Sequence, residues 1–521
     1  MRLKMKRLLL AVSVAVIILS GCTPKHGTTL CVNPLTGTDI PDNDVIRVGD
    51  TYYMVSTTMY FCPGAPIMKS KDLVHWQIVS YIYDCLEDDD IYNLRDGGRH
   101  AYGRGQWATT LRYVDGVYYA LFIANDQGKT YVYRTKDIES SYWERNVIDR
   151  PMHDASLLFD GGRVFCVWGN GDLRITELDA DLRGIKEGGV DQLLISSPRE
   201  GVNLRAEGAH IYHIGDYYYV LEISWPRGGV RTETCWRSKE LLGEYESKVV
   251  LQGAFDGRGD GVAQGAIFDT QFGDWYAVMF QDHGAVGRIP TLQPVTWVDG
   301  WPMMGDNGVP MKEFEVQLTE EGENRVWASD EFDYKDNKDL DLVWQWNHKP
   351  LDGYWSVTER PGWLRLTTGQ LAERIADARN TLTQRTVAPG CFSETKLDAS
   401  AMKPGDHAGL CAFQSNFCAL EVQVADDGTK DLVAIDRREE IVRVPMAGET
   451  VCLRIDYDFT TDKARMYYSF DGNAWTSVDY ELQMRYTLDY FTVYRSALYN
   501  YATKELGGAA DFDYFRQEET L

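Results

Sequence analysis

The sequence has little positive charge, and this deficit excludes two classes of partner. Its 521 residues include 53 Lys and Arg against 78 Asp and Glu, which gives a formal net charge of -25. A chain of this balance repels phosphate backbones and anionic lipid surfaces, so we expect no nucleic-acid partner. At 44% hydrophobic and 12% aromatic residues, the composition is that of a globular protein large enough for several cores.

Closely spaced cysteine pairs of the CxxC type are absent. Of the ten cysteines, nine lie beyond Cys22, and these are odd in number and widely scattered. We therefore expect neither a disulfide framework nor a structural zinc site, and predict that most of these cysteines are small buried apolar side chains. Cys411 and Cys418 are near enough in sequence to pair, although nothing in the sequence demands it.

Apolar runs of 18 or more residues are also absent, and the longest one lies near the N-terminus. Four basic residues precede an apolar stretch of twelve residues, 8–19, which is too short to span a bilayer. The following Leu19-Ser20-Gly21-Cys22 resembles the cleavage box of bacterial lipoproteins. Residues 1–21 are thus predicted to be a lipoprotein signal peptide and Cys22 the lipidated residue. The protein would sit in the cell envelope, its only membrane contact a lipid anchor, and the lack of an acidic run after Cys22 favours the periplasmic side.

Long helical periodicity is lacking, and short alternating segments with Gly or Asp turns dominate, which predicts an all-β protein. One unit recurs five times: an apolar strand, a turn, and an aromatic pair that opens a second strand. The copies are residues 45–53, 111–119, 157–165, 210–218 and 268–276. Their final aromatic residues are 66, 46, 53 and 58 positions apart. Each spacing suits one four-stranded blade with its loops, so residues 30–320 are predicted to form a five-bladed β-propeller.

The repeat also aligns a set of acidic residues. Counting back eleven positions from the final aromatic residue of each copy gives Asp42, Ala108, Asp154, Glu207 and Gly265. Equivalent positions of successive blades are related by rotation about the central axis. Asp42, Asp154 and Glu207 should therefore face one another at one mouth of the channel.

Three converging carboxyl groups suit acid/base catalysis. Like charges in a partly dry cleft raise one another's pKa, so one acid can hold a proton while another stays ionised. Cleavage of a glycosidic bond needs this pair, and the aromatic residues suit stacking against sugars. Calcium binding also gathers carboxylates, but its ligands usually lie densely in one segment, and a purely structural role is the remaining alternative.

Several motifs resemble glycoside hydrolase family 43. They comprise residues 39–47, 61–76, 153–160, 207–212, 287–288 and 294–302. This resemblance implies that Asp42 is the general base, Glu207 the general acid, and Asp154 the carboxylate that positions the acid and adjusts its pKa. It also implies inversion of anomeric configuration and removal of terminal xylose or arabinose.

Two positions depart from the family pattern. The usual Pro-Asp-Pro is Pro41-Asp42-Asn43 here, which makes Asp44 a rival for the base, although the repeat register favours Asp42. Many relatives carry a histidine next to Gln264 that is associated with calcium, and this chain has Ala263. We therefore expect no required cofactor and no metal ligand, and the resemblance gives a central calcium ion little support.

Three further residues are candidates for substrate binding. Trp107 precedes the second axial position and should stack on sugar at the mouth, unless it is a core tryptophan. Phe61 lies in a family-like segment and would wall the terminal-sugar pocket, with plain packing as the alternative. Arg288 resembles the family's arginine that contacts substrate and holds the acids, and a surface arginine is the alternative.

The propeller pattern stops after residue 323, and a second β-rich region is predicted over residues 328–521. Residues 332, 344–348, 378–385 and 405–410 resemble the lectin-like β-sandwich (jelly-roll) attached to many family 43 enzymes. Carbohydrate binding and structural support are both open roles for it. The whole chain is interpreted as an exo-acting β-xylosidase or α-L-arabinofuranosidase acting on oligosaccharide or polysaccharide. The rivals are a non-catalytic glycan-binding lipoprotein and an endo-acting arabinanase or galactanase.

Overall fold

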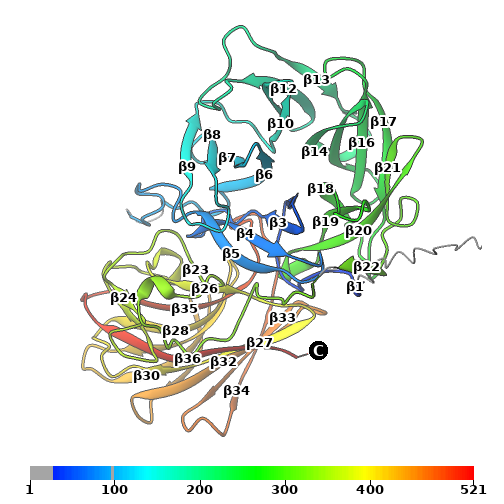
Figure 1. Cartoon of the computed structure of the whole chain (residues 1–521). Coiled ribbons are helices and arrows are strands. Elements are labelled where there is room, and N and C mark those ends of the chain that lie inside the picture. The colour runs from blue at the N-terminus through cyan, green and yellow to red at the C-terminus, as the bar shows by residue number, and fades with distance from the viewer. Residues whose placement is uncertain (1–26, 96–98, 319, 521) are drawn as a thin grey trace, which may run out of the picture.

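A computed structural model describes residues 27–95, 99–318 and 320–520, which form a β-propeller followed by a β-sandwich (Figure 1). The all-β class and both architectures predicted from the sequence are confirmed. The predicted signal peptide and the predicted lipidation site, Cys22, lie outside the described residues. Within the described ranges, we find no helix with the length and apolar character needed to cross a bilayer.

The propeller has five blades, each an antiparallel sheet of four strands in chain order. Adjacent inner strands lie against one another around the axis, and the contact of the fifth with the first closes the ring. The first blade is β2(Asp44–Val48), β3(Thr51–Val55), β4(Gly64–Ser70) and β5(Gln77–Tyr83), and the second is β6(Gln106–Val114), β7(Val117–Ala124), β8(Lys129–Thr135) and β9(Glu144–Ile148). The third is β10(Ser156–Asp160), β11(Arg163–Trp168), β12(Asp172–Leu178) and β13(Asp191–Ser196), and the fourth is β14(Val202–Ile214), β15(Tyr217–Pro226), β16(Thr232–Ser238) and β17(Glu246–Gln252). The fifth is β18(Ala263–Asp269), β19(Trp275–Asp282), β20(Arg288–Val298) and β21(Trp301–Met304).

The aromatic pairs of the repeat begin the second strand of each blade because a tight turn precedes them. In the first blade, Val48 pairs with Thr51 across a two-residue turn in which Gly49 has a φ of 68°. Hairpins of this length favour residues that adopt positive φ. The pair that follows is buried between blades: Tyr52 packs against Phe268 of the fifth blade and Tyr53 against Tyr118 of the second. Outside the blades, β1(Gly27–Val32) pairs with β22(Glu313–Leu318), which ties the start of the propeller to its end.

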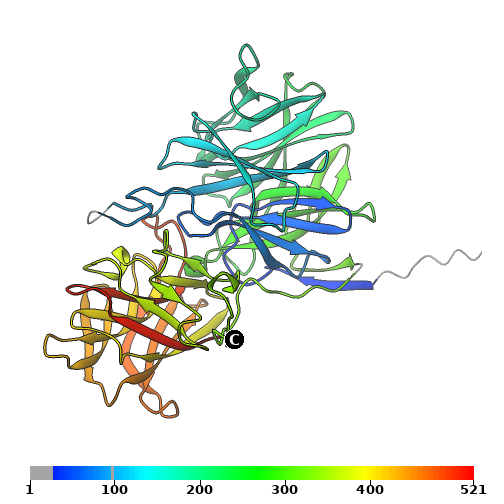
Figure 2. The same cartoon turned by 60° about the vertical axis from the view of Figure 1, so that its left-hand side comes forward.

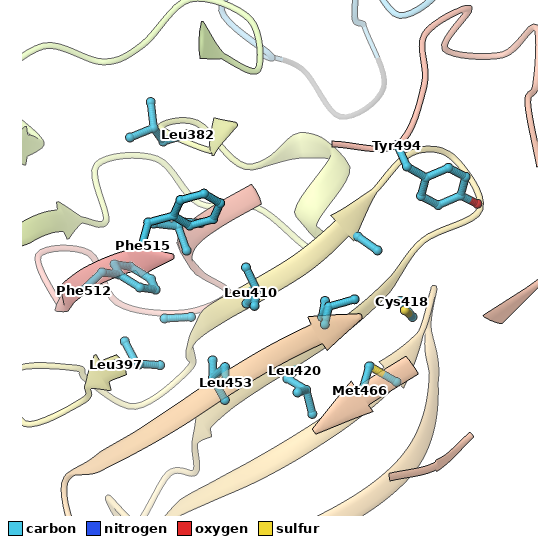
Figure 3. Close-up of a cluster of buried hydrophobic side chains, with 14 of the residues drawn as sticks. Leu382, Leu397, Leu410, Cys418, Leu420, Leu453, Met466, Tyr494, Phe512 and Phe515 are labelled. Atoms are coloured by element: carbon cyan, nitrogen blue, oxygen red, sulfur yellow. The ribbon is translucent and has the colours of Figure 1, made fainter. Parts of the chain in front are cut away.

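The second domain is a sandwich of two seven-stranded sheets. Its core holds leucines and aromatic residues from both sheets, and Figure 3 shows them meeting between the layers. Buried and half-buried positions alternate along its strand β27(Gly390–Asp398), as expected where one face is buried. The first sheet is β23(Gln345–Trp346), β26(Leu382–Arg385), β35(Arg495–Ala502), β28(Asp406–Phe413), β29(Cys418–Val424), β30(Lys430–Asp436) and β31(Glu439–Pro445); the second is β24(Trp355–Ser356), β25(Leu364–Thr367), β36(Ala509–Glu519), β27(Gly390–Asp398), β32(Thr450–Asp458), β33(Lys463–Ser469) and β34(Thr476–Gln483). Three short 3-10 helices, η1(Gly284–Val286), η2(Asn337–Asp339) and η3(Ile375–Asp377), lie in connections.

The two domains share buried apolar clusters, so they pack as one body (Figure 2). Val286 and Ile289 of the propeller belong to the sandwich core cluster. Cys62 makes an isolated antiparallel bridge with Trp346, in which their main-chain groups exchange hydrogen bonds of 3.0 and 2.6 Å. This docking brings sandwich loops to the propeller face that carries the inner-strand starts.

The cysteines differ from the prediction at one pair. Cys62 and Cys85 form a disulfide that joins the loop after β3 to the segment after β5. Their separation of 23 residues carries no signal in sequence, because only the blade's folding brings the two ends together. Cys411 and Cys418 are unpaired, buried thiols, and so are the other five cysteines in the described ranges.

Candidate active site

The three acidic residues picked out by the repeat lie just before, or at a bend within, the inner strands of their blades. Asp42 and Asp154 stand two residues before β2 and β10, and both have left-handed backbones with φ of 53° and 45°. Asp tolerates this region better than most residues, because its short side chain bonds locally. Glu207 lies within β14 at an irregularity in its pairing with β15. These local bends turn the carboxyl groups out of the strands and toward the mouth.

Glu207 is held by two side chains that sequence reasoning had not singled out. Asn170, between β11 and β12, donates an amide hydrogen bond of 2.6 Å to Glu207 Oε2. His153 places its Nε2 3.5 Å from the same oxygen and 3.5 Å from Asp154 Oδ2. The Glu207 side chain is 20% exposed, so solvent and substrate can reach it.

Asp154 is almost fully buried beside this pair. Burial raises the pKa of Asp154, and the nearby charges of Glu207 and Asp42 raise it further, against the opposing charge of His153. Its Oδ2 accepts a 3.1 Å hydrogen bond from the Gly208 main-chain amide, next to Glu207. Asp154 is thereby fixed to the strand that carries Glu207.

Gly208 is required at this point of β14. Its φ is 65°, and a Cβ there would meet the Gln264 side chain at 2.7 Å. Any other residue would be strained at this φ and would have to displace the buried side chain of Gln264 in the fifth blade.

The imidazole of His153 is favoured in its charged form. Burial opposes the charge, but the carboxylates of Asp154 and Glu207 outweigh it and raise the pKa of His153. Its ring also lies edge-on to Trp107, with centroids 5.7 Å apart. The sequence contained His153 only as part of a longer motif, and nothing in its spacing marked it.

Asp42 is paired with the predicted Arg288. The guanidinium Nη1 donates a 2.6 Å hydrogen bond to Asp42 Oδ1, and the Arg288 main-chain amide donates to Asp39 Oδ1 at 2.8 Å. Arg288 is therefore a buried site residue rather than a surface arginine. The rival Asp44 is fully buried and bound to Arg112 Nη1 at 2.7 Å, so it is a structural ion pair below the mouth.

The sandwich domain completes one side of the site. Phe491 comes from the loop between β34 and β35, and its ring centroid lies 5.3 Å from that of Trp107. The guanidinium carbon of Arg288 lies 5.5 Å from the Phe491 centroid. Tyr486 of the same loop is 6.2 Å from Phe491. Sequence reasoning could not find these residues, because they come from a different domain with no repeat register.

The remaining predicted positions have different surroundings. Trp107 is half-buried at the mouth between His153 and Phe491, as a substrate-contacting residue would be. Phe61 does not line an open pocket, because its ring is 1% exposed and the Arg495 guanidinium carbon lies 3.8 Å above it. This is the packing alternative, at the domain interface.

The position associated with calcium in relatives offers no ligand here. Ala263 is fully buried and presents only a methyl group, while the main-chain amide of Gln264 donates to Glu233 Oε2 at 2.8 Å. The residues present therefore do not fit a histidine-bound calcium ion, and we derive no step through one.

Carboxyl groups gathered at one mouth of a propeller, one of them with a pKa raised by burial, are suited to hydrolysis of a glycosidic bond, and they place this protein among the glycoside hydrolases. A family model described as "Glycosyl hydrolases family 43" matches residues 31–302. A second, described as "Beta xylosidase C-terminal Concanavalin A-like domain", matches residues 329–518. The chain belongs to glycoside hydrolase family 43.

Several known proteins resemble the chain over most of its length. A β-xylosidase of Formosa agariphila is 28% identical, with 95% of this chain and 91% of that protein covered. A non-reducing end α-L-arabinofuranosidase of Bacteroides ovatus is 28% identical over 80% of this chain and 78% of its own. The solved structure of a bifunctional GH43-CE protein of Bacteroides eggerthii is 43% identical with a TM-score of 0.89 and covers 95% of this chain. This chain spans 64% of that bifunctional protein's length.

Proposed function

We propose that this glycoside hydrolase is an exo-acting, inverting enzyme that releases terminal xylose or arabinose from hemicellulose-type oligosaccharides. Asp42 is the general base that activates water. Glu207 is the general acid that protonates the leaving oxygen, and Asp154 positions Glu207 and adjusts its protonation. Both activities are those named for similar proteins, a β-xylosidase and an α-L-arabinofuranosidase.

The observation that carries the exo assignment is the wall that the sandwich adds to the site. Phe491 stands against both Trp107 and Arg288, and Arg288 in turn binds Asp42. A chain end fits a site closed on one side, whereas an endo-acting enzyme needs a groove open at both ends. This wall therefore favours removal of one terminal sugar.

The two proton-handling roles follow from the surroundings of each carboxyl group. Arg288 Nη1 donates a 2.6 Å hydrogen bond to Asp42 Oδ1 and so fixes this carboxyl group at the mouth, as a positioned base requires. Glu207 lies beside the buried Asp154 and is reached by solvent, as an acid facing the leaving group requires.

The test is hydrolysis of a panel of 4-nitrophenyl glycosides by the purified protein. Release of nitrophenol from the β-D-xyloside or the α-L-arabinofuranoside is expected, and proton NMR should show the inverted anomer of the sugar first. Binding of xylo- or arabino-oligosaccharides without hydrolysis of either pentoside would instead identify a glycan-binding protein. Release of internal fragments from arabinan would identify an endo-acting enzyme.

We also propose that the protein is attached to the cell envelope through a lipid on Cys22, facing the periplasm. Only the sequence pattern of residues 1–22 supports this. Cys22→Ser should move the protein from the membrane fraction to the soluble fraction. Retention of the variant with membranes would contradict the anchor.

A further inference from the structure

One further feature of the site is that the imidazole of His153 lies between two carboxyl groups. His153 Nε2 lies 3.5 Å from both Asp154 Oδ2 and Glu207 Oε2, and the three atoms all lie within 4.8 Å of one another. Among the described residues, this buried nitrogen has no hydrogen-bond partner. The three residues come from the start of one inner strand and the middle of the next, so the two blades fix their separation.

From this arrangement we infer that His153, Asp154 and Glu207 bind a divalent transition-metal ion of the Zn²⁺ type, which inhibits the enzyme. Two zinc bonds of about 2.1 Å that meet at a tetrahedral angle place their ligand atoms about 3.4 Å apart. The two observed separations of 3.5 Å match this spacing. The fourth position would face the mouth, where water completes the shell.

Both carboxylates are already oriented by groups that are not ligands. Gly208 donates its main-chain amide to Asp154 Oδ2, and Asn170 donates to Glu207 Oε2. Hydrogen bonds of this kind fix the ligand lone pairs and commonly strengthen a metal site. An ion would therefore displace the proton of His153 and bind between two carboxylates whose orientation is already set.

The donor set selects the kind of ion. One imidazole nitrogen with two carboxylate oxygens suits Zn²⁺ or Cu²⁺, whereas Ca²⁺ takes six to eight oxygen ligands and Mg²⁺ a nearly ideal octahedron with several waters. Zinc should bind far more tightly than either. This site is distinct from the calcium position considered beside Ala263.

Inhibition rests on the proposed function, because a metal on Glu207 Oε2 occupies the oxygen that would carry the proton to the leaving group. Substrate and zinc would therefore compete for the site. Binding itself depends only on the three ligands and can be measured without any substrate.

The test uses the mature protein without a histidine tag, freed of metal with a chelator and titrated with zinc chloride in a calorimeter. We expect one tight site per chain in the wild type, and binding at least about 10-fold weaker in His153→Gln. Glu207→Gln is an independent second variant and should weaken zinc similarly, since an amide oxygen is a poor zinc ligand. The matched control is His407→Gln. The His407 side chain is 21% exposed, close to the 22% of His153, and it also contacts a carboxylate, that of Glu421, but it lies in the sandwich.

The outcomes separate the two proposals. Wild-type zinc affinity in both His153→Gln and Glu207→Gln, loss of the site in His407→Gln, or equal binding of calcium would overturn the inference. Zinc bound at His153 by a protein that hydrolyses no pentoside would support the site and reject the proposed function. In an active enzyme, zinc should raise the KM and leave kcat unchanged, and noncompetitive inhibition would place the ion elsewhere.

Discussion

Replacing Glu207 with glutamine separates its proton-donating role from its structural one. A general acid matters in proportion to how badly the departing oxygen needs a proton. Glu207→Gln should therefore lower kcat/KM for xylobiose by about 10²- to 10⁴-fold, the usual contribution of general acid catalysis. For a 2,4-dinitrophenyl pentoside, whose leaving group departs without a proton, the loss should be small.

The structure sets the size of that smaller loss. Glutamine keeps the shape of the side chain, and its carbonyl oxygen can still accept the 2.6 Å bond that Asn170 donates. What changes is the strength of this one hydrogen bond, by about 1 kcal/mol, or roughly 5-fold. The two substrates should thus differ by at least about 20-fold in their response.

The assay is kcat/KM for both substrates in wild type and variant at several pH values. Glu222→Gln is the control, since it changes another buried carboxyl in the same blade. Burial raises the pKa of Glu222 to about 8, so glutamine there replaces a group that is neutral at pH 7. Equal losses for both leaving groups in Glu207→Gln would remove Glu207 as the general acid.

Three further changes test other parts of the site. Asp42→Asn should lower kcat/KM by about 10²-fold or more on both substrates, because water needs the base whatever group departs; a loss confined to xylobiose would contradict this role. Phe491→Ala should lower kcat/KM about 10-fold through loss of its contacts with Trp107 and Arg288, with the melting temperature as a check on folding; unchanged kinetics would show that the wall does not touch substrate. Urea unfolding should show that Glu222 stabilises the protein fully below pH 4.5, the ordinary pKa of a glutamate in an unfolded chain, and that this stabilisation is lost as pH rises through its folded pKa of about 8. Glu222→Gln should remove about 5 kcal/mol of that pH dependence, and parallel curves for the two proteins would refute it.

Sequence reasoning located the blades and the three carboxyl groups because both depend on the same internal repeat. A turn that fixes the aromatic pair also fixes the position eleven residues earlier, so Asp42, Asp154 and Glu207 could be placed at one mouth without coordinates. The left-handed backbones of Asp42 and Asp154 turn their side chains toward that mouth.

The parts that sequence could not supply come from contacts outside the repeat. His153 and Asn170 reach Glu207 from the neighbouring blade, at positions that no periodicity distinguishes. Phe61 lies in a family-like motif but is covered by Arg495, which is 434 residues further along the chain. Only the docking of the second domain decides that this ring is buried.

The loop that carries Phe491 also limits how this protein can be rebuilt. Because the same segment seals the domain contact and borders the pocket, the sandwich is not a detachable module that can be exchanged without consequence. A chimaera that joins this propeller to a relative's sandwich would inherit a foreign pocket border and with it a different choice of chain end. Recombination of domains in such enzymes would then alter substrate preference in a single step, with no change in the propeller.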